Sequence, residues 1–342
     1  MIEAHTLDAW TRTTARQGAA FRDLTVLGGF AAPLFLWLAG LGVVLSATRT
    51  AQRTGSRTAA VDAICRRGLE IFILAFLFRL QAFIVSPGSH PVALFRVDIL
   101  NVMGPAIMAA GLIWAASPTR TARAIAFGAA AFAIAMITPI VRAWAAIDAL
   151  PTWVQWYLRP VGDQTTFTLL PWAGFVFAGG LVGSLIADAR DARGEGRLHA
   201  MFAIAGIALV AAGFYASGRP SIYAAASFWT SSPTWFAIRV GIMMTALAGL
   251  HALASPSLRR VSPFRVALAR LGRSSLFVYW VHVELVYGYA SWLWRHRLPL
   301  WGTAIAYAVF CVLMYGAIVL RDRVVAGWRA RRTAPVVTPA TA

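Results

Sequence analysis

The first ten residues, MIEAHTLDAW, hold two side chains that could perform acid–base chemistry at helical spacing. His5 and Asp8 are three positions apart and share a helix face, whereas Glu3 lies on another face. A carboxylate one turn from an imidazole can accept its ring N–H, fix the tautomer and make the other nitrogen a base or a nucleophile. This pair is the first candidate site, and a polar pair that merely meets water at a helix end is the alternative.

A second cluster lies in FRVDILNVMGPAIM, residues 95–108, where Asp98 stands at the expected start of a helix. The helix dipole stabilises an anion there, and Arg96 lies close enough to neutralise it. Asn101, one turn further on, belongs to the same cluster. An N-terminal cap with a local ion pair is the alternative.

A third stretch, LGRSSLFVYWVHVELVYGY, carries His282 and Glu284 in an otherwise apolar helix, on different faces. His282 lines a cavity or hydrogen-bonds a neighbouring helix; both readings stay open. An ionised Glu284 needs a partner or a raised pKa. Arg239 is one candidate partner, and its snorkelling to the interface is the alternative. His282, Glu284 and Arg239 are the candidate residues of this third group.

The composition of the chain indicates which kind of secondary structure positions these groups. Of 342 residues 59% are hydrophobic and 13% are charged, which is typical of a polytopic membrane protein. The net charge of +18 comes from Arg without Lys, and these Arg residues separate apolar runs, so topology explains them better than nucleic-acid binding. Neither the two Cys nor His90, His199, His251 and His296 show metal-ligand spacing, so no metal is predicted.

Nine apolar runs are long enough, at roughly 20 residues each, to cross about 30 Å of hydrocarbon. They lie near residues 24–47, 68–86, 98–117, 124–141, 168–187, 199–217, 234–254, 274–294 and 299–320. The opening decapeptide, about 15 Å long, is interpreted as half a helix cut by a late start site, with an interfacial helix as the alternative. The prediction is an all-α integral membrane bundle of nine full helices plus this half helix, ten in the complete protein.

We predict one transmembrane domain over residues 1–325 and a disordered, basic, Pro/Thr/Ala-rich tail over residues 326–342. Most Arg residues lie in one alternate set of loops and in this tail, which therefore face the cytoplasm. All-Arg usage is typical of a GC-rich bacterial genome, and the expected location is the bacterial cytoplasmic (inner) membrane with the C-terminus in the cytoplasm. The cluster around Asp98 and the His5 helix then share the outer half of the membrane.

Five stretches in order carry a family resemblance. They are APLFLWLAG (32–40), RVDILNVMG (96–104), LPWAGFVFAGGLVG (170–183), SPTWFAIRVG (232–241) and LGRSSLFVYWVH (271–282). Their order and spacing resemble those of the heparan-α-glucosaminide N-acetyltransferase-like transmembrane acyltransferases from about residue 5 to 320. In that family the first helix begins with an acidic residue and an Arg-Gly pair, both missing here, and His5 falls where the family has its catalytic His.

The resemblance implies transfer of an acetyl group from cytosolic acetyl-CoA to a sugar amine or hydroxyl across the membrane, with His5 catalytic. We then expect Asp8 to orient His5, and we expect the residues of the other two clusters to support the acceptor: Arg96, Asp98, Asn101, Arg239, His282 and Glu284. An acyl-His intermediate and a ternary complex both remain open. Inner-face Arg residues are candidate ligands for the phosphates of coenzyme A: Arg49, Arg66, Arg67 and Arg273. Expected partners are membrane lipids and the acceptor, not nucleic acid, with a homodimer left open. A transporter or permease and a non-catalytic scaffold are the alternative functions.

Overall fold

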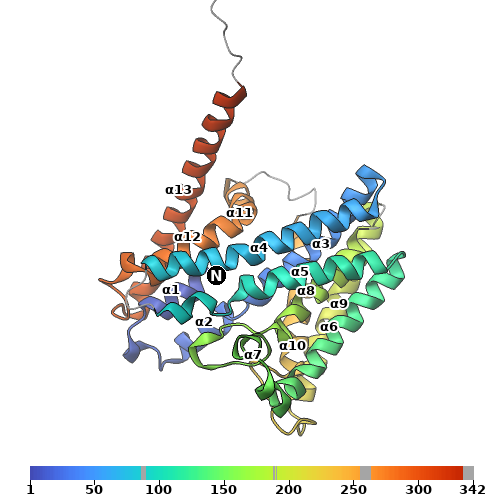
Figure 1. Cartoon of the computed structure of the whole chain (residues 1–342), viewed down its shortest axis with the longest axis horizontal. Coiled ribbons are helices and arrows are strands. Elements are labelled where there is room, and N and C mark those ends of the chain that lie inside the picture. The colour runs from blue at the N-terminus through green and yellow to red at the C-terminus, as the bar shows by residue number, and fades with distance from the viewer. Residues whose placement is uncertain (86–89, 188, 190, 255–262, 334–342) are drawn as a thin grey trace, which may run out of the picture. The chain divides into compact units, whose positions relative to one another are not determined.

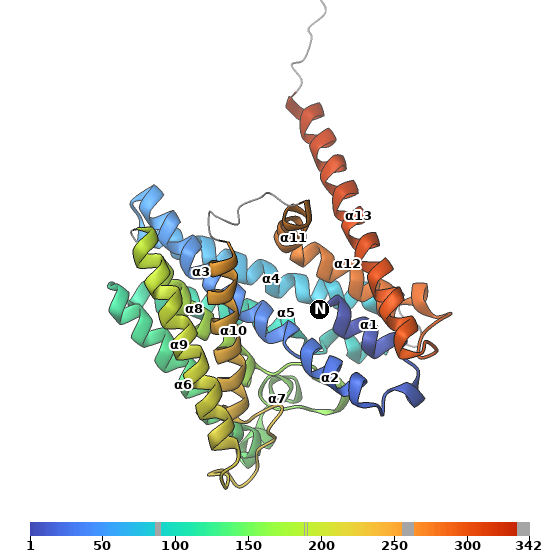
Figure 2. The same cartoon turned by 180° about the vertical axis from the view of Figure 1, so that it is seen from behind.

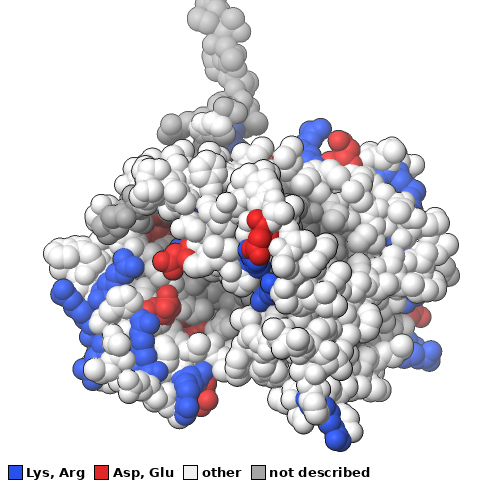
Figure 3. Space-filling model, turned by 60° about the horizontal axis from the view of Figure 1, so that its bottom comes forward, with Lys and Arg blue, Asp and Glu red and all other residues white. Residues whose placement is uncertain are grey.

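The computed structural model describes the chain except for residues 86–89, 188, 190, 255–262 and 334–342 (Figure 1). The described residues are 82% helical and contain no strand, only two isolated bridges. The predicted all-α polytopic membrane fold is confirmed. On the face drawn in Figure 3 most of the surface is uncharged, with Arg, Asp and Glu at scattered positions, as a lipid-exposed protein requires.

Eight helical segments of the described residues are long and apolar enough to cross a membrane. They are Ala19–Thr54, Arg57–Val85, Ile99–Ala116, Arg120–Ala143, Leu169–Ile186, Ala192–Ser217, Pro233–Leu253 and Leu300–Arg329. The predicted span at 274–294 is shorter than expected: α12 covers Ser275–Tyr287, 13 residues or about 20 Å. The chain then turns at Gly288 into the 3₁₀ helix η6, Tyr289–Ser291, where the Ser291 hydroxyl donates to the Val286 carbonyl.

The chain forms two compact units, each described here by itself. The terminal unit comprises Met1–Gly28, Val85–Pro87 and Arg260–Ala342, and the central unit comprises Gly29–Ile84 and Gly88–Arg259. The single domain expected over residues 1–325 stays a prediction. The last helix continues to Thr333, past residue 326 where the tail was expected to begin, and residues 334–342 lie outside the described part.

The terminal unit joins the two ends of the chain. Its helices are α1 (Ile2–Trp10), α2 (Ala19–Gly28), α11 (Pro263–Arg273), α12 and α13 (Leu300–Thr333), with the 3₁₀ helix η1 at Thr13–Ala15. In Figures 1 and 2 α1 lies beside α12 and α13, with which it makes its contacts. Ala9 and Trp10 pack there with Val286, Phe310 and Met314.

A helix as short as α1 is not stable alone, so this packing must hold it. Backbone hydrogen bonds add to it: the N–H groups of His296 and Leu298 donate to the Ala9 and Trp10 carbonyls, at 2.9 and 3.0 Å. The Arg12 N–H in turn donates to the Leu298 carbonyl at 2.8 Å. The C-terminal end of α1 is therefore fixed to the connection between α12 and α13.

The central unit contains the remaining helices. They are α3 (Ala31–Thr54), α4 (Arg57–Val85), α5 (Ile99–Ala116), α6 (Arg120–Ala143), α7 (Thr152–Leu158), α8 (Leu169–Ile186), α9 (Ala192–Ser217) and α10 (Pro233–Leu253). Three 3₁₀ helices lie between them, η2 (Pro91–Phe95), η3 (Ala145–Ala149) and η4 (Gly162–Gln164). A Cβ at Gly40 would lie 1.8 Å from the Val176 carbonyl oxygen, and one at Gly179 equally near that of Trp37. Glycine at both positions lets α3 and α8 touch backbone to backbone.

Candidate active site

Two histidines far apart in the sequence meet inside the terminal unit. His5 on α1 and His282 on α12 place Nδ1 and Nε2 at 3.1 Å, with ring centroids 5.0 Å apart. The His282 side chain is fully buried and His5 is half-buried. The structure therefore selects hydrogen bonding to a neighbouring helix for His282, one of its two predicted roles, and gives it the predicted catalytic residue as partner.

The hydrogen bonds assign the tautomers of both rings. His282 Nδ1 lies 2.6 Å from the Val278 carbonyl oxygen, which can only accept, so this nitrogen carries the proton. In a neutral imidazole Nε2 then carries a lone pair, which must accept from His5 Nδ1–H. His5 consequently bears its own lone pair at Nε2, the atom that a base or a nucleophile uses.

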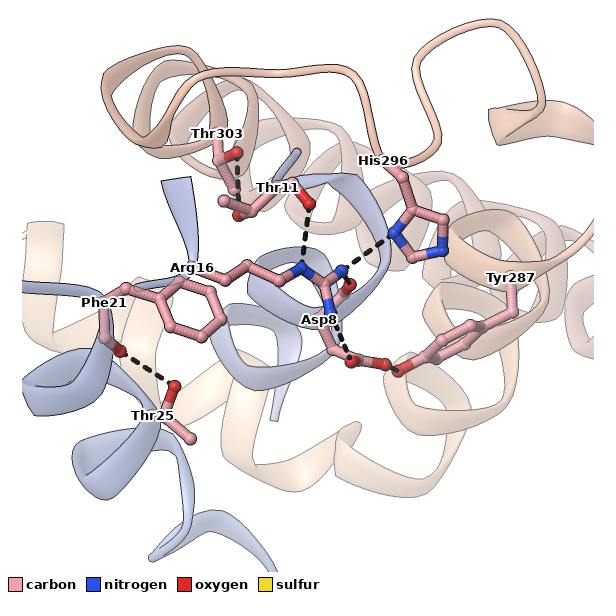
Figure 4. A network of polar contacts seen from close by, with 8 residues as sticks. All are labelled: Asp8, Thr11, Arg16, Phe21, Thr25, Tyr287, His296 and Thr303. Carbon is pink, nitrogen blue, oxygen red and sulfur yellow. Dashed lines mark hydrogen bonds and ion pairs between the residues drawn. The ribbon is translucent and has the colours of Figure 1, made fainter. Parts of the chain in front are cut away.

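Asp8 has different contacts from those predicted (Figure 4). Its Oδ2 accepts a 2.8 Å hydrogen bond from the Tyr287 hydroxyl, and its Oδ1 lies 3.8 Å from an Arg16 nitrogen. The carboxylate is 61% exposed. The ring nitrogen His5 Nδ1, for which Asp8 was the predicted partner, lies 3.1 Å from His282 Nε2 of α12.

Arg16 contacts Asp8, Thr11 and His296 in this region. Its Nε donates to the Thr11 carbonyl at 3.0 Å, and a terminal nitrogen lies 2.8 Å from His296 Nδ1 (Figure 4). A guanidinium can only donate, so His296 Nδ1 accepts and the ring is neutral. Burial, with Arg16 and Arg295 nearby, lowers the pKa of His296 below its usual range.

Two tyrosines that sequence reasoning missed flank His5. The rings of Tyr279 and Tyr287 lie edge-on to the His5 ring at 6.5 and 5.5 Å. Tyr279 is one turn before His282 on α12, which was the available signal, while Tyr287 closes that helix. Tyr287 thus touches both His5 and Asp8 and connects the two residues predicted as a pair.

Glu284 and Arg239 lie in different units of the chain. Glu284 is half-buried on α12 in the terminal unit, and Arg239 is buried on α10 in the central unit, so their pairing stays a prediction. Within its own unit the Arg239 guanidinium stacks over the Trp235 ring at 4.8 Å and lies 5.8 Å from Trp172. These cation–π contacts stabilise a buried guanidinium.

The Asp98 cluster, in the central unit, is a helix cap with an ion pair. Asp98 caps α5: its carboxylate accepts from the Ile99 N–H at 2.7 Å, and Asn101 accepts from the Asp98 N–H at 3.0 Å. The charge partner of Asp98 is Arg79 of α4 and not the predicted Arg96. Arg96 donates to the Thr166 hydroxyl at 2.8 Å instead. The cap anticipated as the alternative is present; the acceptor-binding role stays a prediction.

The four Arg residues proposed for coenzyme A lie in different surroundings. Arg49 is exposed on α3, Arg66 lies 3.4 Å from Asp62, and Arg67 donates to Glu70 at 3.0 Å, all in the central unit. Exposed ion pairs of this kind are weak. Arg273, in the terminal unit, lines a cavity.

That cavity measures about 710 Å³ and is lined by α11, α12 and α13. Its lining residues are Val266, Ala269, Arg270, Arg273, Ser274, Arg321 and Asp322. Asp322 accepts from Arg270 at 3.0 Å and from Arg321 at 2.6 Å, and Arg321 also donates to the Ser274 hydroxyl at 2.9 Å. One carboxylate thus faces two of the three guanidinium groups, so the cavity keeps an excess of positive charge. Such a cavity suits a phosphate.

The cavity and the histidine pair share one helix. Ser274 precedes α12 at the cavity, and His282 lies about two turns further along, roughly 12 Å in axial rise. The terminal unit thus has an Arg-lined cavity at the start of α12 and a pair of imidazoles about two turns further along the same helix.

The sequence profile of a protein family described as "Acyltransferase domain" matches residues 1–320 of the chain. No curated protein sequence matches it. The matched range contains His5, His282 and Arg273.

Proposed function

The chain belongs to the acyltransferase family whose domain profile covers residues 1–320, and on this premise we propose that His5 is the catalytic group of the acyl transfer. The observation that carries the proposal is the relay from the Val278 carbonyl through His282 to His5. The relay fixes the tautomer of His5 with the lone pair on Nε2, which is the state that can take a proton or attack a carbonyl.

In the ternary-complex form of the reaction, His5 Nε2 takes the proton of the acceptor hydroxyl or amine as that oxygen or nitrogen attacks the thioester carbonyl. The new C–O or C–N bond forms, the C–S bond breaks, and the thiolate leaves with the proton that His5 held. In the two-step form, Nε2 attacks the thioester carbonyl, a C–N bond to the ring forms, the C–S bond breaks and coenzyme A leaves as the thiolate. The acceptor oxygen or nitrogen then attacks the acyl carbon, the C–N bond to the ring breaks, and the proton of the acceptor goes to the thiolate or to water. In both forms His5 becomes positively charged, and its Nδ1–H remains bonded to His282.

We propose acetyl-CoA as the donor. Coenzyme A has phosphates at one end and the thioester at the other, joined by an extended arm. The Arg-lined cavity lies at the start of α12, and the His5–His282 pair lies about two turns further along this helix, a separation that suits a ligand of this form. Arg273 is the best phosphate ligand among the four predicted Arg residues, because it lines the cavity and makes no ion pair with a described residue.

For the acceptor we retain a sugar amine or hydroxyl on the outer side of the membrane, with the cytoplasm on the side of the C-terminal end. The narrower kinship with heparan-α-glucosaminide N-acetyltransferase-like enzymes is part of this proposal. It rests on the five stretches of sequence and on the place of His5 within them.

The test uses the full chain, purified in detergent and supplied with radiolabelled acetyl-CoA and a panel of amino sugars. Label transfer and release of the coenzyme A thiol are both measured. We expect His5→Ala to lower transfer by about 10²–10⁴-fold, and the matched control His90→Ala, at an exposed histidine of the central unit, to retain it. Full transfer by His5→Ala would remove His5 from the mechanism.

Binding of acetyl-CoA separates the proposal from its rivals. A permease or a scaffold has no reason to bind the thioester, so absence of binding to the unmodified chain would favour them. Binding of acetyl-CoA without transfer to any sugar would support acetyl-CoA as the donor but would overturn the proposed class of acceptor.

A further inference from the structure

Three side chains with metal-binding atoms meet between α9 and α10 in the central unit. They are Glu195 and His199 from the first turns of α9 and His251 from the last turn of α10. One ligand atom from each lies within 4.8 Å of the others. We propose that these residues bind a divalent transition-metal ion, with zinc as the best candidate. The inference is independent of the acyl transfer.

The α9 pair has the spacing and the tautomer that a metal site needs. Glu195 and His199 are four positions apart, so they share one face of the helix. His199 Nδ1 lies 2.8 Å from the Glu195 carbonyl oxygen and must donate to it, which puts the lone pair on Nε2. Metal-binding histidines commonly donate their second ring nitrogen to a backbone carbonyl in this way.

His251 completes the set from the neighbouring helix. Its ring lies parallel to that of His199 with centroids 3.8 Å apart, and its Nδ1 is 3.7 Å from a Glu195 carboxylate oxygen. Figure 2 shows α9 and α10 running side by side. Their backbones are in close contact, since a Cβ at Gly206 would lie 2.6 Å from the Gly241 carbonyl oxygen. This packing holds the three ligands together.

The burial of the three residues suits a bound ion that is reached from water. His199 is buried, while the side chains of His251 and Glu195 are 34% and 46% exposed. An ion can therefore enter from the open side and keep a water as its fourth ligand. Arg193 and Arg197 are each two positions from Glu195 and point to other faces of α9, so they do not fill the site.

The chemical types of the three ligand atoms indicate which ion the site binds. Two imidazole nitrogens and one carboxylate oxygen suit zinc and its transition-metal neighbours, whereas calcium and magnesium require sites built mainly of oxygen. A metal lies in the plane of each imidazole that binds it, so binding rotates the two rings out of their parallel stack. A neutral stacked pair beside a carboxylate, without metal affinity, is the competing explanation.

The test titrates zinc against a chromophoric chelator in the purified full chain after metal has been removed. We expect one site per chain, weakened by more than about tenfold in Glu195→Gln and in His251→Asn. His90→Asn, which removes a histidine elsewhere in the central unit, is the matched control and should bind as the unmodified chain does. Excess magnesium or calcium should not compete.

His251 and Glu195 are the residues to change, because their partial exposure makes misfolding of the variants less of a concern than at buried His199. Thermal unfolding gives a second measurement: zinc should raise the midpoint of the unmodified chain and of His90→Asn, but not that of His251→Asn. Cobalt substitution should give the visible bands of a four-coordinate ion. Equal zinc affinity in all variants, or no affinity in any, would overturn the proposal.

Discussion

His282 makes the sharpest test of the proposed mechanism, because its only proposed task is to hold the His5 ring in the reactive tautomer. His282→Leu removes the acceptor that lies 3.1 Å from His5 Nδ1 and keeps an apolar side chain in a fully buried position. His282→Gln can keep a carbonyl oxygen near the place of Nε2. The two variants separate the loss of the acceptor from the loss of the ring.

The size of the effect follows from the charge state of His5. When His5 takes a proton, its Nδ1–H becomes the donor of a charged hydrogen bond, worth about 1.5–3 kcal/mol. Loss of that bond in the transition state should lower kcat/KM by about 10- to 150-fold. This is less than the loss expected for His5→Ala, because the base itself remains.

The assay measures initial rates of acetyl transfer over a range of donor concentrations. We expect the fall to lie in kcat with KM for the donor unchanged, since the bond gains its strength only after proton transfer. His282→Gln should recover part of the loss. A thermal unfolding curve for each variant controls for misfolding, because the Leu variant leaves the Val278 carbonyl without the His282 donor. The reasoning is refuted if His282→Leu changes kcat by less than about threefold, or if both folded variants are equally slow.

Three other perturbations test separate parts of the structure. The lowered pKa of His296 means that the unfolded chain binds a proton near pH 6.5 before the folded chain does. Thermal stability should therefore be constant above that pH and fall as the pH drops through the lower folded-state pKa, and His296→Gln should flatten this dependence. Arg273→Ala should weaken coenzyme A binding by about tenfold or more in an equilibrium binding assay. The control Arg120→Ala, at an exposed Arg outside the cavity, should leave binding unchanged. Equal losses in both variants would show that the overall positive charge, and not the cavity, determines binding. Asp98→Asn leaves Arg79 without its carboxylate and should lower the free energy of unfolding, measured with denaturant, by about 3 kcal/mol. Adding Arg79→Met should recover most of that loss. No recovery would show that loss of the ion pair is not the cause.

The long helices could be predicted because a span is a local property of the sequence. An apolar run between Arg-rich breaks fixes both the type and the approximate ends of a helix such as α6, Arg120–Ala143. The same logic failed for the run at 274–294. There the Ser291 hydroxyl bonds back to the Val286 carbonyl, and the chain turns although its residues remain apolar. Mean hydropathy carries no information about such a hydrogen bond.

The sequence singled out the two histidines of the candidate site but did not predict that they pair with each other. His5 and His282 were both recognised as polar groups in apolar surroundings, and helical periodicity then favoured the nearest carboxylate, Asp8, as partner. The observed partner comes from a helix at the other end of the chain. For the same reason, the charge partner of Asp98 is Arg79 from a neighbouring helix and not the predicted Arg96. Sequence spacing predicts neighbours within a helix, whereas packing between helices decides these contacts.

The sequence likewise did not predict the contact between His199 of α9 and His251 of α10. His199 and His251 show no ligand spacing along the sequence, although Glu195 and His199 are one helical turn apart. Only the close packing of the two helices brings the third ligand to them.

The distance along the chain between His5 and His282 also sets when a working site can exist during synthesis. The two residues are 277 positions apart. At about 5–20 residues per second, a ribosome needs roughly 14 to 55 seconds to go from one to the other. Until then the first imidazole has no acceptor to fix its tautomer. Under the proposed mechanism, acyl transfer by this chain would therefore begin only when nearly the whole protein has been translated.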